Sequence, residues 1–263
     1  MSNISPSEKL NQLGDIPNAL INPGPCNRAW VEVDSKAIEN NSRVLKNFIN
    51  EDCLLMAVVK ADGYGHGALT VARSALRGGA DSLGVATLEE GIELRKAGIK
   101  CQILILGNLI NWDELYSSLY WNLIPTISGI REAIICNNIA ESQKKQIHIH
   151  LKVDTGMTRL GCDLDEVHEL VVKIKSLKNI NLDGIYSHLA LADHDYKQKK
   201  HSVNFTKIQL ERFKKTLRTL DREVQTSCCH LANSAGTLLD RSLHFDMVRV
   251  GLCLYGYSPI IDC

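Results

Sequence analysis

The chain alternates between short apolar segments and longer segments in which apolar residues recur every three or four positions. The short segments suit strands buried on both faces, and the longer ones suit helices that lay one face on a sheet. Such alternation predicts βα units, a parallel sheet and the α/β fold class. Eight strands, the number that closes a (β/α)8 TIM-type barrel, are expected over residues 54–60, 82–87, 102–107, 123–127, 147–154, 184–190, 228–233 and 247–255.

Local signals mark the ends of several helices between these strands. The segment 87–90 reads Thr-Leu-Glu-Glu and fits a capping box, in which the threonine hydroxyl and the last glutamate each satisfy a backbone amide. Gly98 suits the left-handed residue that follows the end of that helix. Two further helices, over 163–174 and 205–220, are predicted from apolar residues three and four positions apart.

A segment before the barrel, 28–34, alternates like a half-buried strand. We expect an extra N-terminal strand there, followed by a helix to about residue 50 with Ser35 as its cap. The barrel domain is therefore predicted over 28–263. Residues 1–27 are polar, lack a secretion signal and predict a flexible tail, and the charged segment 193–201 predicts a mobile surface loop.

Composition narrows the classes of function. Thirty basic and thirty acidic side chains cancel over 263 residues, so no net charge favours nucleic acid or an anionic membrane as a partner. Nine cysteines, an odd number without a Cys-x-x-Cys pair, fit a reducing compartment. No apolar run is long enough to cross a bilayer, and the histidines form no evident metal set. We therefore expect a cytoplasmic protein that binds a small ligand.

A lysine interrupts one of the most apolar segments. Residues 54–67 read Leu-Leu-Met-Ala-Val-Val-Lys-Ala-Asp-Gly-Tyr-Gly-His-Gly, so a strand reaches Lys60 and a glycine-rich loop follows. In parallel α/β folds that edge of the sheet binds ligands. Lys60 could simply extend past its neighbours into water. Alternatively, a desolvated lysine supplies the free amine that Schiff-base chemistry requires, with the hydroxyl of Tyr64 close by.

Other candidate side chains lie at or near predicted strand ends. Lys152 and Arg159 flank a glycine-bearing loop, where a salt-bridged strand end is the plainer alternative. His188 lies in an apolar strand, as core histidines also do. Arg249 lies in another, and burying its guanidinium without a partner would be costly. Ser234 follows a strand and could hold a phosphate at a helix amino terminus or act only as a helix cap.

These segments resemble a known family. The run Ala-Val-Val-Lys-Ala-Asp-Gly-Tyr-Gly-His-Gly over 57–67 is similar to the pyridoxal-phosphate attachment motif of the alanine racemases, and the resemblance extends from about residue 28 to the end of the chain. It implies an aldimine between Lys60 and pyridoxal 5'-phosphate, which serves the interconversion of L-alanine and D-alanine. The cofactor-binding residues that it implies are Lys60, Tyr64, His188, Asn233, Ser234, Arg249, Gly251 and Leu252.

The same resemblance assigns roles to single residues. The arginine that matches Arg249 donates to the pyridine nitrogen and is held by the histidine that matches His188, which leaves the ring a weaker electron sink. Arg159 matches the arginine that contacts the substrate carboxylate. Lys152 matches a lysine that is often carbamylated and then orients that arginine. Ser234 and its neighbours match residues that hold the phosphate.

The resemblance also implies parts that the expected barrel lacks. Alanine racemases are homodimers in which the second base is a tyrosine from the C-terminal β domain of the partner subunit. The sequence stops at Cys263, where that domain should begin. We therefore expect a cytoplasmic isomerase that supplies D-alanine for peptidoglycan, represented by its barrel and incomplete for catalysis. The alternatives are a non-catalytic single-domain barrel that carries pyridoxal phosphate, and a racemase of another small amino acid.

Overall fold

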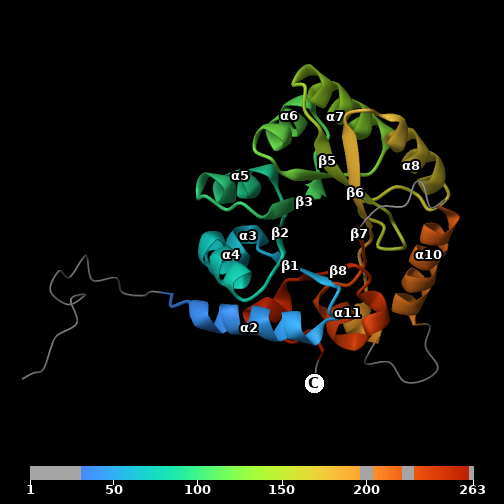
Figure 1. The fold of residues 1–263 in the computed structure, drawn as a ribbon. Coiled ribbons are helices and arrows are strands. Elements are labelled where there is room, and N and C mark those ends of the chain that lie inside the picture. Colours follow the sequence, from blue (N-terminus) through green and yellow to red (C-terminus); the bar gives the residue numbers. More distant parts are fainter. Residues whose placement is uncertain (1–30, 196–203, 221–227, 261–263) are drawn as a thin grey trace, which may run out of the picture. The chain divides into compact units, whose positions relative to one another are not determined.

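The larger part of the chain is a closed barrel of eight parallel strands. A computed structural model describes residues 31–195, 204–220 and 228–260. The barrel lies within the unit Asp34–Cys263. The strands pair in sequence order, and the last closes onto the first (Figure 1). They are β1 Leu54–Val58, β2 Ser82–Val85, β3 Gln102–Asn108, β4 Ile124–Ile127, β5 Ile147–Lys152, β6 Ile180–Tyr186, β7 Cys228–His230 and β8 Met247–Val250.

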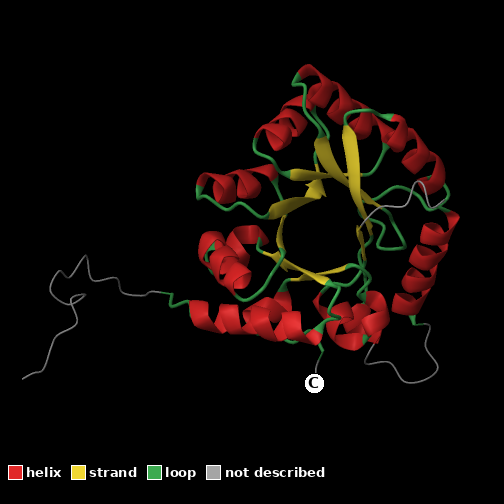
Figure 2. Cartoon of the chain, in the orientation of Figure 1, coloured by secondary structure: helices red, strands yellow, loops and turns green. Residues whose placement is uncertain are grey.

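Helices surround the strands on the outside (Figure 2). No helix in the described part is long and apolar enough to cross a membrane. The helices of this outer layer are α2 Ser35–Phe48, α4 Ala68–Arg77, α5 Leu88–Lys96, α6 Trp112–Tyr120, α7 Ile130–Ser142, α8 Val167–Ser176, α10 Phe205–Thr219 and α11 Ser234–Leu239. Short turns complete the described part: α3 Lys60–Gly65, α9 Ala192–Asp195, η3 Arg241–Leu243 and η4 Leu252–Tyr255.

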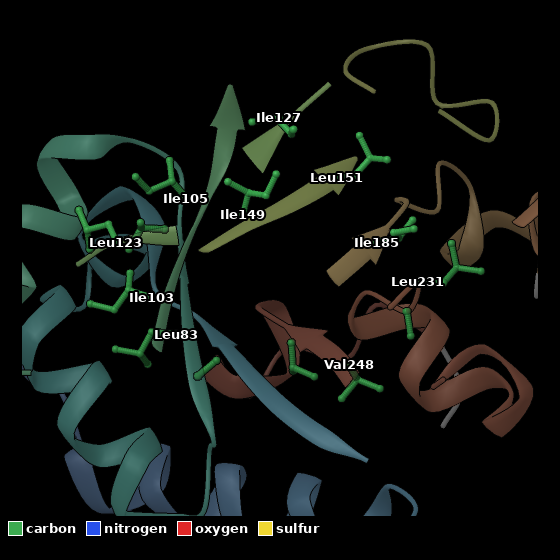
Figure 3. Packing of buried hydrophobic residues seen from close by; sticks show 14 of the residues in the cluster. Leu83, Ile103, Ile105, Leu123, Ile127, Ile149, Leu151, Ile185, Leu231 and Val248 are labelled. Atoms are coloured by element: carbon green, nitrogen blue, oxygen red, sulfur yellow. The ribbon is translucent and has the colours of Figure 1, made fainter. Parts of the chain in front are cut away.

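Most of the hydrophobic core lies between the strands and the helices. Alternate strand residues such as Leu83, Ile103 and Val248 belong to this core (Figure 3). A smaller apolar cluster that includes Met56 and Tyr186 is made by residues of the opposite alternation. Burial on both faces explains why the strands read as nearly continuous apolar runs. The rigid barrel leaves the segments after each strand to carry the polar side chains.

The prediction of an eight-stranded α/β barrel is confirmed. The capping box before α5 is confirmed too, because the Thr87 hydroxyl accepts from the Glu90 amide and the Glu90 carboxylate accepts from the Thr87 amide. Gly98, at φ 88°, follows that helix in the left-handed region, as predicted. The helix expected over 163–174 exists but begins later, at Val167, after a series of turns.

Several predicted boundaries are wrong. The strand expected over 184–190 runs over Ile180–Tyr186 because it pairs with β5 from Ile147 onward, although polar residues interrupt its first half. The strand expected over 54–60 ends at Val58 because the helical turn α3 begins at Lys60. The strand expected to reach residue 255 ends at Val250, and a 3-10 turn follows.

The expectations for the amino-terminal segment need correction as well. Residues 31–34, the described part of the strand expected over 28–34, are not in a strand, and the closed barrel offers no free edge to pair with. Asp34 caps α2 in place of Ser35, because its carboxylate accepts from the amides of Lys36 and Ala37 at 2.9 and 3.0 Å.

The charged segment expected as a loop over 193–201 is only partly described. Its first residues belong to the single helical turn α9, Ala192–Asp195, which corrects the expectation of a continuous loop. Residues 196–203 lie outside the described part, as do 28–30 of the expected N-terminal strand.

Candidate active site

One cavity gathers the predicted site residues at the carboxyl-terminal ends of the strands. Its volume is about 450 Å³, and its wall is built from segments at or just after the ends of β1, β2, β3, β5, β6, β7 and β8. All ten residues predicted for the site line it: Lys60, Tyr64, Lys152, Arg159, His188, Asn233, Ser234, Arg249, Gly251 and Leu252. Segments far apart in the sequence thus converge on one volume with the size of a small-molecule site.

Lys60 begins an unusual turn rather than ending a strand. Residues 61–64 have φ values from 50° to 61°, so α3 contains a left-handed turn, and of these four residues only Gly63 is a glycine. Left-handed backbone costs roughly 1–2 kcal/mol for each residue with a side chain. Two carboxylates compensate: Glu90 accepts from the Ala61 amide at 2.7 Å, and Asp62 accepts from the Ala68 amide at 2.7 Å. Glu90, the α5 capping residue, therefore also anchors the lysine turn.

Hydroxyl groups gather at the β7 and β8 side of the cavity. The Ser234 hydroxyl accepts from the Gly251 amide at 3.0 Å, which leaves its own hydrogen to donate. A side chain at Gly251 would place its Cβ 2.7 Å from the Tyr64 hydroxyl, so only glycine leaves that phenol in place. Burial raises the pKa of Tyr64, which keeps the phenol protonated. Asn233, not Ser234, caps α11, so the alternative that Ser234 is only a cap is wrong.

Arg249 lies inside β8, buried to 3% exposure, and part of its guanidinium is engaged in hydrogen bonds. Nη1 donates to His230 Nδ1 at 2.7 Å, and Nη2 donates to the carbonyl oxygens of Ser187 at 2.6 Å and Leu231 at 3.1 Å. His188 Nδ1 is farther away, 3.4 Å from Nη2. Burial lowers the pKa of Arg249 to about 10, which still leaves it charged at neutral pH.

Lys152 and Arg249 approach the same phenol ring. Lys152 Nζ lies 5.4 Å and Arg249 Cζ 5.0 Å from the centre of Tyr186, within the range of cation–π attraction. Burial, followed by the charges of Arg249 and Arg159, lowers the pKa of Lys152 to about 8. A buried amine of this kind holds a sizeable neutral, nucleophilic fraction near neutral pH.

Known proteins resemble this chain over most of its length. A family described as "Alanine racemase, N-terminal domain" matches residues 33–259. The alanine racemase of Prochlorococcus marinus is 58% identical over 238 residues, which cover 90% of this chain and 61% of that protein. The alanine racemase of a Nostoc species is 43% identical over 88% of this chain and 59% of its own length. The chain therefore spans about three fifths of these curated relatives.

Solved structures agree with the sequence comparison. The alanine racemase of Clostridium difficile 630, in complex with cycloserine, has a TM-score of 0.80 and 34% identity over 86% of this chain and 61% of its own. The Bacillus anthracis alanine racemase with bound L-Ala-P has a TM-score of 0.80 and 32% identity over 91% and 61%. The chain belongs to the alanine racemase family.

The residues that line this cavity fit pyridoxal phosphate. The hydroxyls of Tyr64 and Ser234, close to the Gly251 backbone, suit a phosphate group. Lys60 offers a primary amine to an aldehyde, and Arg249 presents a cation deeper in the barrel. Among the described residues that line the cavity, Asp193 is the one acidic residue, so an anionic ligand meets little opposing charge.

Two residues next to the site of this racemase-family barrel were not predicted from the sequence. His230 is fully buried and holds Arg249 more closely than His188 does. Tyr186 is 1% exposed, stacks on His230 with ring centroids 4.6 Å apart, and its hydroxyl hydrogen-bonds Thr126 at 2.8 Å. The signal that could have found them is the alternation along β6 and β7, which turns both side chains toward the barrel axis as it does Arg249 on β8.

Proposed function

We propose that this chain is the cofactor-binding barrel of a pyridoxal-phosphate-dependent alanine racemase, an isomerase of L- and D-alanine. The observation that carries the proposal is the convergence of Lys60, Tyr64, Ser234 and Arg249 on one cavity of about 450 Å³. Membership of the alanine racemase family supports it. As the family resemblance implies, we also propose a cytoplasmic homodimer that supplies D-alanine for peptidoglycan.

The proposed cofactor contacts divide between the two ends of the cavity. Tyr64, Asn233 and Ser234, with the backbone of Gly251 and Leu252, form the phosphate end. The Ser234 hydrogen and the protonated Tyr64 phenol are the donors that support this assignment. When bound there, pyridoxal phosphate supplies an electron-withdrawing ring that acidifies the α-hydrogen of an attached amino acid.

Arg249 limits how far that acidification goes. Its guanidinium donates hydrogen bonds and keeps its own proton at neutral pH, so it would meet the ring nitrogen as a donor without giving that proton away. The side chains beside Arg249, His188 and His230, are imidazoles and not carboxylic acids. Burial and the charge of Arg249 lower the pKa of His188 to about 3, so that imidazole is neutral. We therefore propose that Arg249 favours brief loss and prompt return of the α-proton, which suits racemisation.

Lys60 and Arg159 are the residues proposed to act on the substrate. The amine of Lys60 would accept or return the proton at the α-carbon from one face, because Lys60 lines the cavity in which the substrate would bind. Arg159 lines the same cavity and would bind the substrate carboxylate through its guanidinium fork. The base for the opposite face, a tyrosine of the partner subunit, stays a prediction from the family resemblance.

Lys152 is proposed as a carbamylated lysine. Carbon dioxide reacts with neutral amines, and the pKa of about 8 gives Lys152 such a fraction at neutral pH. The carbamate would replace a cation by an anion between Arg249 and Arg159, the two charges that now lower its pKa. That change would relieve the repulsion and orient Arg159 toward the substrate.

Hydrogen exchange at the α-carbon tests the proposed function. The protein loaded with pyridoxal phosphate in D2O should replace the α-hydrogen of alanine with deuterium, as followed by proton NMR. Lys60→Arg should slow this exchange by about 100-fold or more, the usual contribution of a positioned base. Free pyridoxal phosphate is the control, and serine in place of alanine tests the alternative of another small amino acid.

Two outcomes would count against the proposal. Exchange no faster than that with free pyridoxal phosphate would favour the alternative of a non-catalytic barrel that carries the cofactor. Exchange that survives Lys60→Arg would remove Lys60 from the proton transfer. The named relatives are alanine racemases, so the comparisons favour the racemase over the non-catalytic alternative.

A further inference from the structure

A second cavity lies at the opposite end of the barrel. It has a volume of about 300 Å³ and is bounded by residues near the starts of the strands, among them Leu54, Gln102 and Met247. His150, on β5, also lines this cavity although only 5% of it is exposed. His150 therefore lines this cavity and also belongs to a chain of hydrogen bonds that reaches the active site.

One imidazole, that of His230, joins His150 to Arg249. Arg249 Nη1 lies 2.7 Å from His230 Nδ1, and His230 Nε2 lies 2.9 Å from His150 Nδ1. All three side chains are at most 5% exposed. A continuous line of hydrogen bonds therefore runs along the barrel interior from one cavity to the other.

Arg249 fixes the direction of every bond in that line. A guanidinium only donates, so His230 Nδ1 must accept and the His230 hydrogen must be on Nε2. That hydrogen can only be donated to His150 Nδ1, which places the His150 hydrogen on Nε2. Nothing in the described residues accepts a hydrogen bond from His150 Nε2, which leaves that N–H to the second cavity.

Burial and charge keep both imidazoles neutral, as this arrangement requires. Burial first, and then the charge of Arg249, lower the pKa of His150 to about 3 and that of His230 well below its usual value. His148 also adds to the shift of His150, and it is paired with Asp183 at 2.8 Å. A neutral imidazole has one hydrogen, so each ring can accept on one side and donate on the other.

The packing around the rings favours a single orientation. Tyr186 lies flat against His230, with an interplanar angle of 3°. Gly184 faces His150, and a Cβ there would come within 2.7 Å of His150 Cε1 and 2.8 Å of Nδ1. The barrel thus leaves room for the His150 ring by omitting a side chain on the neighbouring strand, and neither ring can turn freely.

We propose that His150 is a positioning residue for Arg249, which it holds through His230, so that the active site is tied to the cavity at the far end of the barrel. The proposed effect on pyridoxal phosphate rests on the proposed function, but the hydrogen-bond relay itself does not. Without His150, the buried His230 N–H would lose its acceptor, and the orientation of His230 against Arg249 would no longer be fixed.

A soft-metal site in the second cavity is the competing interpretation, because Cys228, Met56 and Met247 line it together with His150. Two observations oppose it. The relay places a hydrogen on the one His150 nitrogen that faces the cavity. Burial raises the pKa of Cys228 to about 12, so the thiol is protonated and binds metal poorly.

Nitrogen NMR of the cofactor-free protein tests the relay directly. With 15N-labelled histidine, His150 and His230 should both show the neutral tautomer with hydrogen on Nε2, unchanged from pH 8 down to pH 5.5. Single His→Gln variants would assign the two signals. Hydrogen on Nδ1 of either ring, or protonation of either ring above pH 5.5, would overturn the proposal whatever the protein binds.

Variants at His150 test its effect on Arg249. His150→Leu should change the nitrogen shifts of His230 and weaken pyridoxal phosphate binding about tenfold, the loss expected for one buried hydrogen bond. His150→Asn keeps an acceptor near the position of Nδ1 and should restore affinity to within about threefold. His148→Leu, on the same strand and half exposed, should leave both readouts unchanged.

The outcomes separate this proposal from the proposed function. Equal losses in His150→Leu and His150→Asn would reveal a packing role only and would contradict the relay. Unchanged affinity in both variants would contradict it as well. Correct tautomers in a protein that does not bind pyridoxal phosphate would instead contradict the proposed function and leave the relay intact.

Discussion

At the scale of single residues, the cavity is dominated by buried positive charge. Lys152 and Arg249 are 5% and 3% exposed, and both lie within 5.4 Å of the centre of the Tyr186 ring. The phenol face attracts both cations, but no carboxylate of the described residues pairs with either in an ion pair. Such an arrangement costs stability, and proteins accept that cost where an anion is to be bound.

The cost at Lys152 can be measured from its pH dependence. Its pKa is lowered from 10.5 to about 8, so the folded state binds fewer protons than the unfolded state between these values. Stability therefore rises with pH across that window, and below pH 8 the folded protein carries the full penalty of at most about 3 kcal/mol. Lys152→Met should stabilise the protein at pH 6.5 by about 1–3 kcal/mol, and this gain should vanish by pH 10.5.

Urea unfolding at several pH values, in buffers freed of carbon dioxide, provides the measurement. Lys100→Met removes an exposed lysine instead and should show no such pH dependence. A gain for Lys152→Met that is the same at pH 6.5 and pH 10.5 would mean that better packing, and not relief of a buried charge, is the cause.

At the scale of elements, the left-handed turn α3 sets the direction in which the chain leaves β1. Ala61, Asp62 and Tyr64 adopt φ values near 50° that favour glycine, so the turn is held by its surroundings. Glu90 at the start of α5 accepts from the amides of Ala61 and Ala86 and thereby ties the turn to the neighbouring βα unit. The strain is concentrated beside Lys60, which must reach the cavity from the rim.

Substitution by glycine tests this strain. Ala61→Gly should stabilise the protein by up to about 1 kcal/mol, because relief of the left-handed backbone outweighs the added entropy of the unfolded chain. Ala37→Gly, at an exposed position of α2, should destabilise it by about 1 kcal/mol. Urea midpoints would show the two opposite signs, and destabilisation by both variants would show that α3 is not strained.

At the scale of the whole molecule, the sequence predicted the barrel because each of its strands is buried on both faces and reads as an apolar run. The predicted boundaries are wrong where apolar residues continue past the end of a strand, as they do beyond Tyr186. The end of that strand is set by its pairing with β5 and not by hydrophobicity. The prediction of an N-terminal strand is wrong in its described part for a related reason. Alternating apolar and polar residues favour a strand, but they do not supply a neighbouring strand to pair with.

The predicted site residues, which line the cavity, could be found from the sequence because each lies in the segment after a strand or, like Lys152 and Arg249, is a charge inside one. The contact between His150 and His230 could not, since 80 positions separate them and only closure of the barrel brings them together. The left-handed geometry of α3 was hidden as well, because three of the left-handed residues 61–64 are not glycines.

Lys60 is proposed to hold pyridoxal phosphate in the cavity that it shares with Arg249. The most direct test adds pyridoxal phosphate, reduces the adduct with borohydride and locates the label by peptide mass, with Lys60→Ala as the control. We expect one label, on Lys60, and none in the variant. A label on Lys152 or on another lysine, with Lys60 unmodified, would contradict it.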